Sequence, residues 1–453
     1  MRSLDVSANR HYLVKPDGTP FFYLADTAWE LFHRLDRVKA EAYLTNRAAK
    51  GFTVIQAVVL AEVGGLNVPN PYGNLPLHDL DPAQPNEAYF EHVDFIVNKA
   101  AELGLVIGML PTWGDKINKM WGSGPEIFTP DNANAFGTFL GKRYKHKPII
   151  WILGGDRPAP QKSTRDLWRA LAAGLHAGDG GRHLITFHSW AHNSSSDYIH
   201  EEPWVDFNML QTSHVVTNNV VCYWQVYADY LRQPPKPTLN GEPCYEASPI
   251  ANPIAGDVTK GCFDDFDIRQ STYWSLLAGG CGVTYGCHLI WQMLGEGSDR
   301  AHVDAKGWEQ ALDLPGSFQV GYARQLYESR AYTKLRTDQA LIADWQGYMG
   351  EFKAVALADD GSFAFIYIPT GTRVGIAMEK ICSQVRAQWF DPRTGAWTLI
   401  DAYPNTGLQS FTPPSSGRGN DWVLVLDAVL NTDKQHGMGT DIGRDPTVRP
   451  NPA

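Results

Sequence analysis

Two segments of this chain end in the same way, with an apolar run followed by a carboxylate. Residues Pro148–Leu153 lead through two glycines to Asp156, and residues Pro237–Asn240 lead through one glycine to Glu242. Each segment is typical of a buried parallel strand that presents an acidic side chain from its C-terminal tip. Hydrolysis of a glycosidic bond needs one carboxyl group as an acid and a second on the other side of the anomeric carbon. The pair therefore predicts a glycoside hydrolase.

Each carboxylate also has a structural interpretation. Asp156 could cap a helix or pair with the neighbouring Arg157, and Glu242 could lie on a loop surface. Glu246 competes with Glu242 for the role of nucleophile, and the residues alone do not decide between them. The two carboxylates together are a stronger signal than either one, because both follow a predicted strand end.

Polar and aromatic side chains lie at or just beyond the ends of the other predicted strands. A ring of such groups at one rim suits the recognition of sugar hydroxyls beside an aromatic stacking surface. Any one of these side chains could equally have a structural role, and we favour Asp26, His188 and Trp291. The candidate substrate-binding residues are Asp26, Gln56, Trp113, His188, Trp190, Gln211, Asn240 and Trp291.

These residues need a scaffold of alternating strands and helices. The predicted strands are 21–25, 52–60, 105–110, 148–153, 183–188, 207–211, 237–240 and 282–286. Helical patterns separate them, such as the stripe of Val93, Ile96 and Val97. Strands that are apolar on both faces predict an α/β fold, a (β/α)8 barrel over residues 1–335. An open doubly wound sheet is disfavoured, because no glycine-rich phosphate turn follows the first strand.

The pattern changes after about residue 336, where short strands and tight turns alternate. This pattern predicts a small all-β sandwich over residues 336–430, followed by an irregular tail over residues 431–453. Trp389, Trp397 and Trp422 each stand in a strand-like alternation and are predicted to be buried. The module is therefore expected to brace the barrel rather than to bind glycan.

Composition excludes several other function classes. The formal net charge is −10, which disfavours nucleic acid and anionic membranes as partners. No run of about 18 apolar residues predicts a membrane helix. The first seven residues lack a leader's apolar stretch, so the protein is expected to be cytoplasmic, or secreted or periplasmic if a leader has been removed. The sequence leaves the oligomeric state open.

No motif for metal or cofactor chemistry is present. The six cysteines form no C-x-x-C pair, and the chain has no H-E-x-x-H or G-x-S-x-G segment. We therefore expect neither a metal site nor a cofactor. The expected partner is a carbohydrate substrate.

Three segments carry a resemblance to a known family. Tyr23–Leu31, Trp151–Asp156 and Asn240–Glu246 resemble the apiosidase-like glycoside hydrolases of family 140, and the resemblance extends from about residue 5 to the end. It includes the C-terminal module, which in such proteins is often labelled a collagen-binding domain. The resemblance implies a barrel of a large retaining clan, with Asp156 as acid/base and Glu242 as nucleophile. It also implies removal of terminal apiose, a furanose, from branched pectin.

The chain departs from the wider clan at the tip of the fourth strand. Many members have Asn-Glu where this chain has Gly155-Asp156. The missing asparagine removes a usual partner of the sugar 2-hydroxyl, and His188 or Asn240 could replace it. We interpret the small Gly154-Gly155 step as room for a branched leaving group.

Two other functions remain open on the same scaffold. The first is a glycosidase of another specificity, exo or endo, and the second is a catalytically inactive barrel that binds carbohydrate. The intact pair Asp156 and Glu242 argues against the inactive barrel. The long loops 62–86 and 113–128 are expected to narrow the mouth, which favours an exo-acting pocket over an open cleft.

Overall fold

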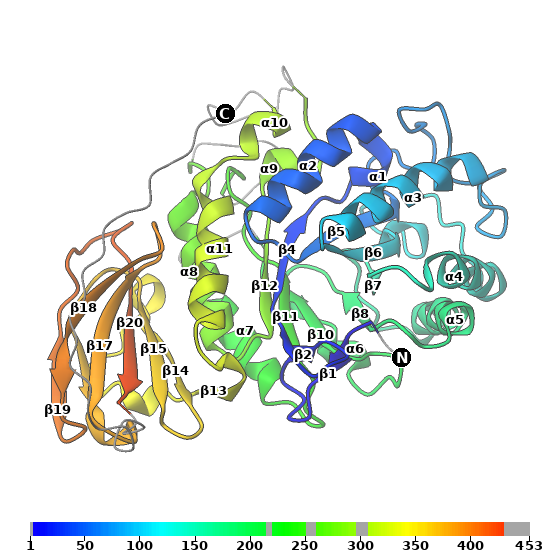
Figure 1. Ribbon diagram of the computed structural model, residues 1–453. Coiled ribbons are helices and arrows are strands. Elements are labelled where there is room, and N and C mark those ends of the chain that lie inside the picture. The colour runs from blue at the N-terminus through cyan, green and yellow to red at the C-terminus, as the bar shows by residue number, and fades with distance from the viewer. Residues whose placement is uncertain (1–2, 214–219, 251–259, 296–306, 430–453) are drawn as a thin grey trace, which may run out of the picture.

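A computed structural model describes residues 3–213, 220–250, 260–295 and 307–429. The predicted irregular tail, residues 431–453, lies outside the described residues. The chain forms a barrel of parallel strands surrounded by helices, and an all-β module lies beside it (Figure 1).

Eight parallel strands build the barrel, in the spatial order β8-β7-β6-β5-β4-β12-β11-β10. A short strand, β9, is antiparallel to β10. Between β8 and β10, the Asp206 amide donates to the Ile185 carbonyl at 2.8 Å, and this contact helps to close the ring. The predicted (β/α)8 barrel is confirmed. Its eight parallel strands are β4 (Tyr23–Thr27), β5 (Val54–Leu60), β6 (Val106–Thr112), β7 (Ile149–Gly154), β8 (Ile185–His188), β10 (Asn208–Gln211), β11 (Thr238–Glu242) and β12 (Gly282–Tyr285), and the short antiparallel strand is β9 (Asn193–Ser194).

The helices surround this sheet and alternate with its strands. They begin where the sequence provides caps: the Thr129 side chain accepts from the Asn132 amide, and Pro130 is the first residue of its helix. The longer helices are α2 (Arg37–Ala49), α3 (Glu87–Glu102), α4 (Pro130–Tyr144), α5 (Lys162–Asp179), α7 (Val221–Tyr230), α8 (Asp265–Leu277) and α11 (Pro315–Glu328). The short ones are α1 (Leu31–Arg34), α6 (Ser196–Ile199), α9 (His288–Trp291), α10 (Trp308–Ala311) and the 3-10 turn η1 (Gly114–Lys116).

A small antiparallel sheet precedes the barrel in the chain. It consists of β1 (Asp5–Val6), β2 (Leu13–Val14) and β3 (Pro20–Phe21), and lies near the N-terminus at the bottom of Figure 1. His11, in the turn of this sheet, stacks on Tyr230 at the end of α7, with ring centroids 4.4 Å apart. The end of α7 therefore lies at the end of the barrel where the parallel strands begin.

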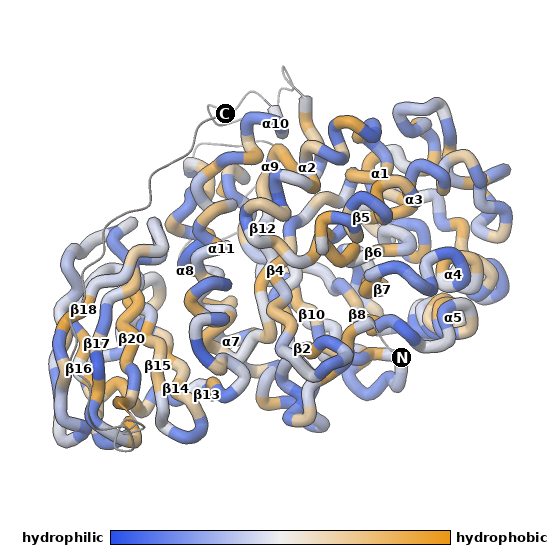
Figure 2. Tube along the Cα trace, viewed as in Figure 1, coloured by the Kyte–Doolittle hydropathy of each residue, from blue (hydrophilic) through white to orange (hydrophobic). Residues whose placement is uncertain are grey.

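The C-terminal module consists of two β-layers around its own apolar core. A six-stranded antiparallel sheet has the order β13-β14-β15-β20-β17-β18, and the pair β16-β19 packs on it. Figure 2 shows apolar residues along the strands of both the barrel and this module. The strands are β13 (Leu335–Thr337), β14 (Ala354–Ala358), β15 (Phe363–Ile368), β16 (Val374–Ala377), β17 (Val385–Asp391), β18 (Ala396–Tyr403), β19 (Leu408–Phe411) and β20 (Trp422–Ala428). Its 3-10 turns are η2 (Tyr332–Lys334), η3 (Gln339–Leu341), η4 (Met349–Glu351) and η5 (Met378–Lys380).

One of the three tryptophans predicted to be buried in this module is not. Trp389 and Trp422 are buried, but Trp397 is 39% exposed. It lies on the edge strand β18, whose residues are mostly exposed, and it contacts Phe390 and the Arg330 guanidinium at its ring. The predicted strand is present, but β18 lies at the edge of its sheet and none of its residues is buried.

The module is attached to the barrel through helix α8, which Figure 1 shows between the two. Arg269 of α8 forms a buried ion pair with Asp421, at 2.8 Å, and the Tyr367 hydroxyl also donates to Asp421. The Trp274 indole donates to the Phe352 carbonyl at 2.8 Å. Because these contacts are buried and directional, they fix the module against helix α8.

Candidate active site

The turn after β7 has an unusual backbone. Gly154, Gly155 and Asp156 have φ values of 89°, 107° and 55°, all in the region that side chains disfavour. A Cβ on Gly154 would lie 2.1 Å from the His188 carbonyl oxygen, and one on Gly155 would lie 2.7 Å from the Gly114 amide nitrogen. Neighbouring backbone fills the space beside these glycines. The interpretation of the Gly154-Gly155 step as room for a leaving group is therefore wrong.

This turn leaves the Asp156 carboxyl group partly accessible, with a quarter of its side chain exposed. The Trp121 indole donates to its Oδ2 atom at 3.4 Å. The Arg157 guanidinium lies 3.8 Å from the same oxygen, but its hydrogen bonds go to the carbonyls of Asp156, Asn118 and Lys119. Arg157 therefore mainly holds the loop after η1 in place. The Asp156 carboxyl group stays partly exposed to solvent.

The environment of Asp156 favours its protonated form. Burial and then the negative charge of Glu242 raise the pKa of the Asp156 carboxyl to about 6. His188, Arg157 and the hydrogen bond from Trp121 act in the opposite direction. A carboxyl group with such a pKa can donate a proton under mildly acidic conditions.

One imidazole connects the two carboxylate-bearing strand ends. The Asp156 amide donates to Nδ1 of His188 at 3.3 Å, so the proton of a neutral ring is on Nε2. This Nε2 atom lies 2.8 Å from Oε2 of Glu242, the last residue of β11. The ring is buried between Trp29 and Trp113, with centroid distances of 5.5 and 5.7 Å. His188 thus holds a fixed position between Asp156 and Glu242.

Tyr245 also interacts with Glu242. Burial and then the charge of Glu242 raise the pKa of the Tyr245 hydroxyl well above its usual value, so the phenol stays protonated beside the carboxylate. Tyr245 and Trp29 were not among the candidate residues. Both belong to the segments that carry the family resemblance, but no spacing rule distinguishes them from core aromatics.

Glu246 is directed elsewhere. The Tyr285 hydroxyl donates to its Oε2 atom at 2.5 Å, and the Gly316 amide donates to Oε1 at 3.1 Å. Gly316 belongs to the first turn of α11, and burial raises the pKa of Glu246 to about 7. Both oxygens of Glu246 are thus occupied, one by Tyr285 of strand β12 and one by Gly316 of helix α11.

Asp26 also faces the helix layer. Its Oδ2 atom accepts hydrogen bonds from the Tyr43 hydroxyl and from Nε of Arg47, both at 2.6 Å and both from α2. The Asp26–Arg47 ion pair is fully buried. Asp26, which we favoured as a substrate-binding residue, therefore connects β4 to α2.

Replacement of Asp26 by Asn is expected to lower the free energy of unfolding by about 3–5 kcal/mol, because it leaves the Arg47 guanidinium buried without its anion. Urea unfolding of Asp26→Asn and of the exposed control Asp401→Asn measures this effect, and the control should change by less than about 0.5 kcal/mol. A variant of normal stability with a raised KM would instead place Asp26 at the substrate.

Asn240 and Gln56 lie within the barrel wall. The Asn240 amide donates to the hydroxyls of Thr212 and Ser275, each at 3.0 Å, and Ser275 belongs to α8. Asn240 is therefore not placed to replace the missing partner of a sugar 2-hydroxyl. The Gln56 amide donates to the Gly241 carbonyl at 3.2 Å, one residue before Glu242. Gln56 thus positions the end of β11.

Gln211 and Trp190 lie near the pair. Gln211 is in register with Glu242 on the neighbouring strand, and its Oε1 atom is buried with no hydrogen-bond partner among the described residues. Trp190 is half-buried and stacks on Trp121, with centroids 5.7 Å apart. Trp121 was missed because it lies in an irregular loop. Trp291 is half-buried on α9, and its carbonyl accepts from the Glu30 amide.

Glu62 is a third carboxyl group at this end of the barrel. It follows β5 by two residues and is half-buried, and no described residue hydrogen-bonds to its carboxyl group. Burial and then the charges of Asp156 and Asp115 raise the pKa of Glu62 to about 8. Near neutral pH, Glu62 is therefore a protonated, available donor close to Asp156.

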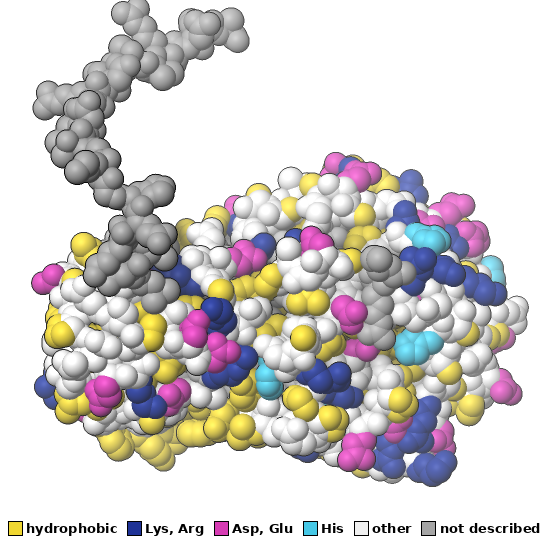
Figure 3. Space-filling view, turned by 60° about the horizontal axis from the view of Figure 1, so that its bottom comes forward, with side chains coloured by type: hydrophobic (Ala, Val, Ile, Leu, Met, Phe, Trp, Pro, Cys, Tyr) yellow, Lys and Arg dark blue, Asp and Glu magenta, His cyan; other side chains and the backbone are white. Residues whose placement is uncertain are grey.

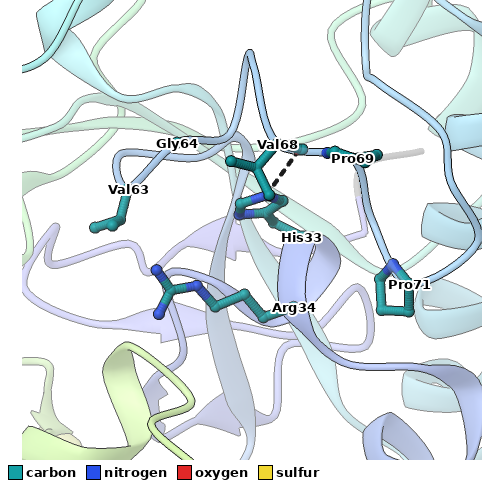
Figure 4. Close-up of a pocket in the computed structure, with 7 residues that line it drawn as sticks. All are labelled: His33, Arg34, Val63, Gly64, Val68, Pro69 and Pro71. Atoms are coloured by element: carbon teal, nitrogen blue, oxygen red, sulfur yellow. Dashed lines mark hydrogen bonds between the residues drawn. The ribbon is translucent and has the colours of Figure 1, made fainter. Parts of the chain in front are cut away.

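The 62–86 loop and α1 enclose a cavity of about 420 Å³ at the same end (Figure 4). Glu30 fixes the loop, because it accepts from the Val63 amide at 2.9 Å and lies 2.8 Å from Nδ1 of His33. The Arg34 guanidinium donates to the Gln292 carbonyl. The lining residues are His33, Arg34, Val63, Gly64, Val68, Pro69 and Pro71.

The described residues include neither a metal-binding cluster nor a membrane-spanning helix. Within them, no group of three His, Cys, Asp or Glu side chains could hold a metal ion. None of the helices in the described ranges has both the length and the apolar character needed to cross a membrane.

Comparisons with known proteins identify the family and the fold. A family model described as "Apiosidase-like, catalytic domain" matches residues 7–334, and one described as "Putative collagen-binding domain of a collagenase" matches residues 337–427. A solved structure titled "Glycoside hydrolase" is 30% identical with a TM-score of 0.86, covering 94% of this chain and 97% of that chain. A glycoside hydrolase family 5 structure from Bacteroides vulgatus is 28% identical with a TM-score of 0.86, covering 94% and 93%. Among curated proteins, none matches the chain.

Proposed function

This chain belongs to the apiosidase-like family of glycoside hydrolases, and on that premise we propose that it is a retaining exo-glycosidase. Asp156 is the acid/base and Glu242 the nucleophile. The substrate is a terminal sugar, a furanose of the apiose type, on a pectic or related plant glycan. The family name supports this sugar, and the contact of His188 with both catalytic positions carries the assignment of the residues.

The geometry supports retention of configuration. Retaining enzymes have carboxyl groups about 5–5.5 Å apart, whereas inverting enzymes need about 6.5–9.5 Å to admit a water molecule. Glu242 lies close enough to Asp156 for its charge to raise the pKa of that carboxyl group, which favours the shorter separation. The contacts of Glu246 with Tyr285 and Gly316 leave Glu242 as the better nucleophile.

Each residue has a defined part in the two chemical steps. Protonated Asp156 gives its proton to the leaving oxygen while Glu242 bonds to the anomeric carbon and the glycosidic bond breaks. Esterified Glu242 no longer carries the charge that raises the pKa of Asp156, so the pKa of Asp156 falls. Ionised Asp156 can then take a proton from water, which attacks the anomeric carbon and releases Glu242.

The sugar hydroxyls need hydrogen-bond partners other than His188 and Asn240, the two residues that the sequence suggested. Both ring nitrogens of His188 contact protein groups, and the Asn240 amide is bonded to Thr212 and Ser275. Gln211 offers a buried acceptor without a partner among the described residues, and Glu62 offers a carboxyl group. We assign hydroxyl recognition to Gln211 and Glu62.

The aromatic wall beside Asp156 supports exo action. Trp121 stacks on Trp190, and the Arg157 guanidinium lies 4.3 Å from the Trp121 ring centroid. This stack lies beside the Asp156 carboxyl group. It would block the passage of a long glycan chain at that position. Together with the loop fixed by Glu30, it favours a pocket over an open groove.

The test is hydrolysis of a panel of aryl glycosides, apiosides included, and of pectic oligosaccharides by the wild-type protein. Release of one terminal sugar, with the first anomer seen by proton NMR matching that of the substrate, supports the proposal. Release of internal fragments would show endo action, and a first product of opposite configuration would show inversion. Hydrolysis of a different glycone would replace the apiose-type sugar.

The pH profile should reflect the acid. We expect kcat/KM for an unactivated glycoside to fall about tenfold per pH unit above about pH 6, because Asp156 must be protonated and loses its proton there. Trp121→Phe removes a hydrogen bond that lowers this pKa, so its falling limb should lie at higher pH. Trp397→Phe, on the C-terminal module, is the matched control. A profile that stays flat from pH 6 to 8 would contradict the role of Asp156.

A further inference from the structure

Glu62 presents a carboxyl group from a segment whose backbone is fixed on both sides. It follows β5 by two residues, and no described residue hydrogen-bonds to this carboxyl group. On one side, the Lys116 ammonium donates to the Ala61 carbonyl at 2.8 Å. On the other side, the Val63 amide donates to Oε1 of Glu30 at 2.9 Å. The backbone at Glu62 is thus held by two side chains that leave its own carboxyl group available.

Hydrogen bonds between backbone groups add to this support. The Trp113 amide donates to the Leu60 carbonyl at 3.1 Å, and the Gly64 amide donates to the Glu62 carbonyl, also at 3.1 Å. Successive peptide groups around Glu62 therefore have fixed partners, although the residue lies beyond the end of β5 in an irregular segment. A carboxyl group on such a backbone loses little conformational entropy when it binds a ligand.

The two supporting side chains come from the strands on either side of β5. Glu30 follows β4, and Lys116 lies in η1 after β6, in a sheet whose order is β6-β5-β4. The carboxyl ends of parallel barrel strands meet at one rim, which is the end that carries Asp156 and Glu242. Three neighbouring strand ends thus form a rigid frame that presents Glu62 at the catalytic end of the barrel.

Both supporting side chains are buried ions with their own counter-ions. Figure 3 shows Lys, Arg, Asp and Glu side chains spread over the surface of one face, where such groups usually lie. Glu30 is instead fully buried, and its Oε2 atom lies 2.8 Å from Nδ1 of His33. The Lys116 ammonium is also buried and lies 2.7 Å from Oδ1 of Asp115. Burial of an ion costs several kcal/mol, so we interpret these pairs as devices that fix one geometry rather than as sources of stability.

Several charges determine the protonation state of Glu62. Burial and then the charge of Asp156 raise the pKa of its carboxyl group to about 8, and Lys116 acts in the opposite direction. The charged groups that face Glu62 are Asp156, Asp115, Glu30, Lys116 and Arg157. Below about pH 8 the group is therefore a hydrogen-bond donor, and above it an acceptor only.

We propose that Glu30 and Lys116 are positioning residues that hold the Glu62 carboxyl group for a hydrogen bond to a hydroxyl of the terminal sugar. Neither residue contacts the sugar, and each acts through the backbone beside Glu62. The inference rests on the proposed function, because the sugar is the one that the barrel removes. It adds the frame on which recognition of that sugar depends.

The test is a ligand-observed NMR titration with apiose, which needs no turnover. Glu62→Ala should lower the affinity about 3–10-fold at pH 6, the effect of losing one hydrogen bond. Glu30→Ala and Lys116→Met should each lower it to a similar extent, whereas Glu30→Gln keeps an acceptor for the backbone amide and should retain most of it. In the Glu62→Ala background, neither Glu30→Ala nor Lys116→Met should lower it further, because both act through Glu62. Additive losses overturn the proposal.

The pH dependence of this affinity gives a readout that a merely structural role would not move. The affinity should change through about pH 8 in the wild type, and it should not change in Glu62→Gln, which does not titrate. Glu30→Gln removes a charge that raises the pKa of Glu62, so the change should move to lower pH. Lys116→Met removes a charge that lowers this pKa, so the change should move to higher pH. Shifts in the same direction, or no shift, overturn the proposal.

His92→Gln is the matched control. His92 is buried, its Nε2 atom contacts the Leu35 carbonyl, and its ring lies 5.0 Å from that of Tyr72 in the 62–86 loop. It supports the same loop without contact to the peptide groups beside Glu62, so its replacement should leave the affinity unchanged. An equal loss in His92→Gln and Glu30→Ala overturns the proposal, because any loosening of the loop would then have the same effect.

The inference and the proposed function fail in different ways. Thermal unfolding curves show whether Lys116→Met is folded, and the Glu30 and Glu62 variants carry the test if it is not. Glu62-dependent binding of apiose by a protein that hydrolyses none of the glycosides would support the positioning role and contradict the exo-glycosidase activity. Hydrolysis of apiosides, with an apiose affinity that is unchanged in Glu62→Ala, would contradict the positioning role alone.

Discussion

Glu242→Ala is expected to lower kcat for an aryl glycoside by about 10⁴-fold, equivalent to about 5.4 kcal/mol of transition-state free energy. The variant cannot form the bond to the anomeric carbon, and it also loses the carboxylate beside His188 that would stabilise positive charge in the transition state. The measurement is steady-state hydrolysis of an activated aryl glycoside, with a thermal unfolding curve to show that the variant is folded.

Azide identifies the role of Glu242 directly. In the cavity left by the side chain, azide should attack the anomeric carbon and release a glycosyl azide of configuration opposite to the substrate. Glu246→Gln is the matched control, since Glu246 lies four residues away and is bonded to Tyr285 and to the start of α11. It should keep kcat and lose stability. The reverse pattern, with activity surviving in Glu242→Ala and lost in Glu246→Gln, would transfer the role to Glu246.

Asp156→Ala is expected to have an effect that depends on the leaving group. For a natural glycoside, kcat/KM should fall by about 10²–10⁴-fold, because the leaving oxygen no longer receives a proton. For an activated nitrophenyl glycoside the loss should be much smaller in the first step, since that group leaves without protonation. A plot of log(kcat/KM) against the pKa of the leaving group measures this dependence. Its slope should be steeper for the variant than for the wild type.

Azide again provides the diagnostic product. In Asp156→Ala it should attack the glycosyl-enzyme intermediate, so the glycosyl azide keeps the configuration of the substrate. Asp166→Ala, an exposed acidic residue on α5 that pairs with Lys162, serves as control and should behave as the wild type. An equal loss on natural and activated substrates, with no azide product, would mean that Asp156 positions other groups rather than transferring a proton.

Much of the scaffold could be predicted from local sequence. All eight parallel strands lie where apolar runs end in turns, because strands buried on both faces need a continuous apolar segment. The start of α4 at Thr129 and Pro130 could be predicted for a similar reason. The Thr129 side chain accepts a hydrogen bond from a backbone amide in the first turn of the same helix. Such features depend on residues a few positions apart.

The direction of individual polar side chains could not be predicted in this way. Asp26 and Asn240 lie on barrel strands as expected, but Asp26 is bonded to Arg47 of α2 and Asn240 to Ser275 of α8. A strand pattern shows that a residue is near a rim, but not which neighbouring helix offers it a partner. Trp121, which donates to Asp156, gave no signal because its loop has no periodicity.

The sequence by itself determined the class of the enzyme: two carboxylates at strand ends, an apolar strand pattern that closes into a barrel, and a β module after it. The different surroundings of the neighbouring residues Glu242 and Glu246 were visible only in the tertiary structure. Glu246 is bonded to Gly316, which lies 70 residues away in the chain, whereas Glu242 lies beside His188 from another strand. Hydrogen bonds between such distant segments depend on how the whole barrel closes, and no local pattern encodes them.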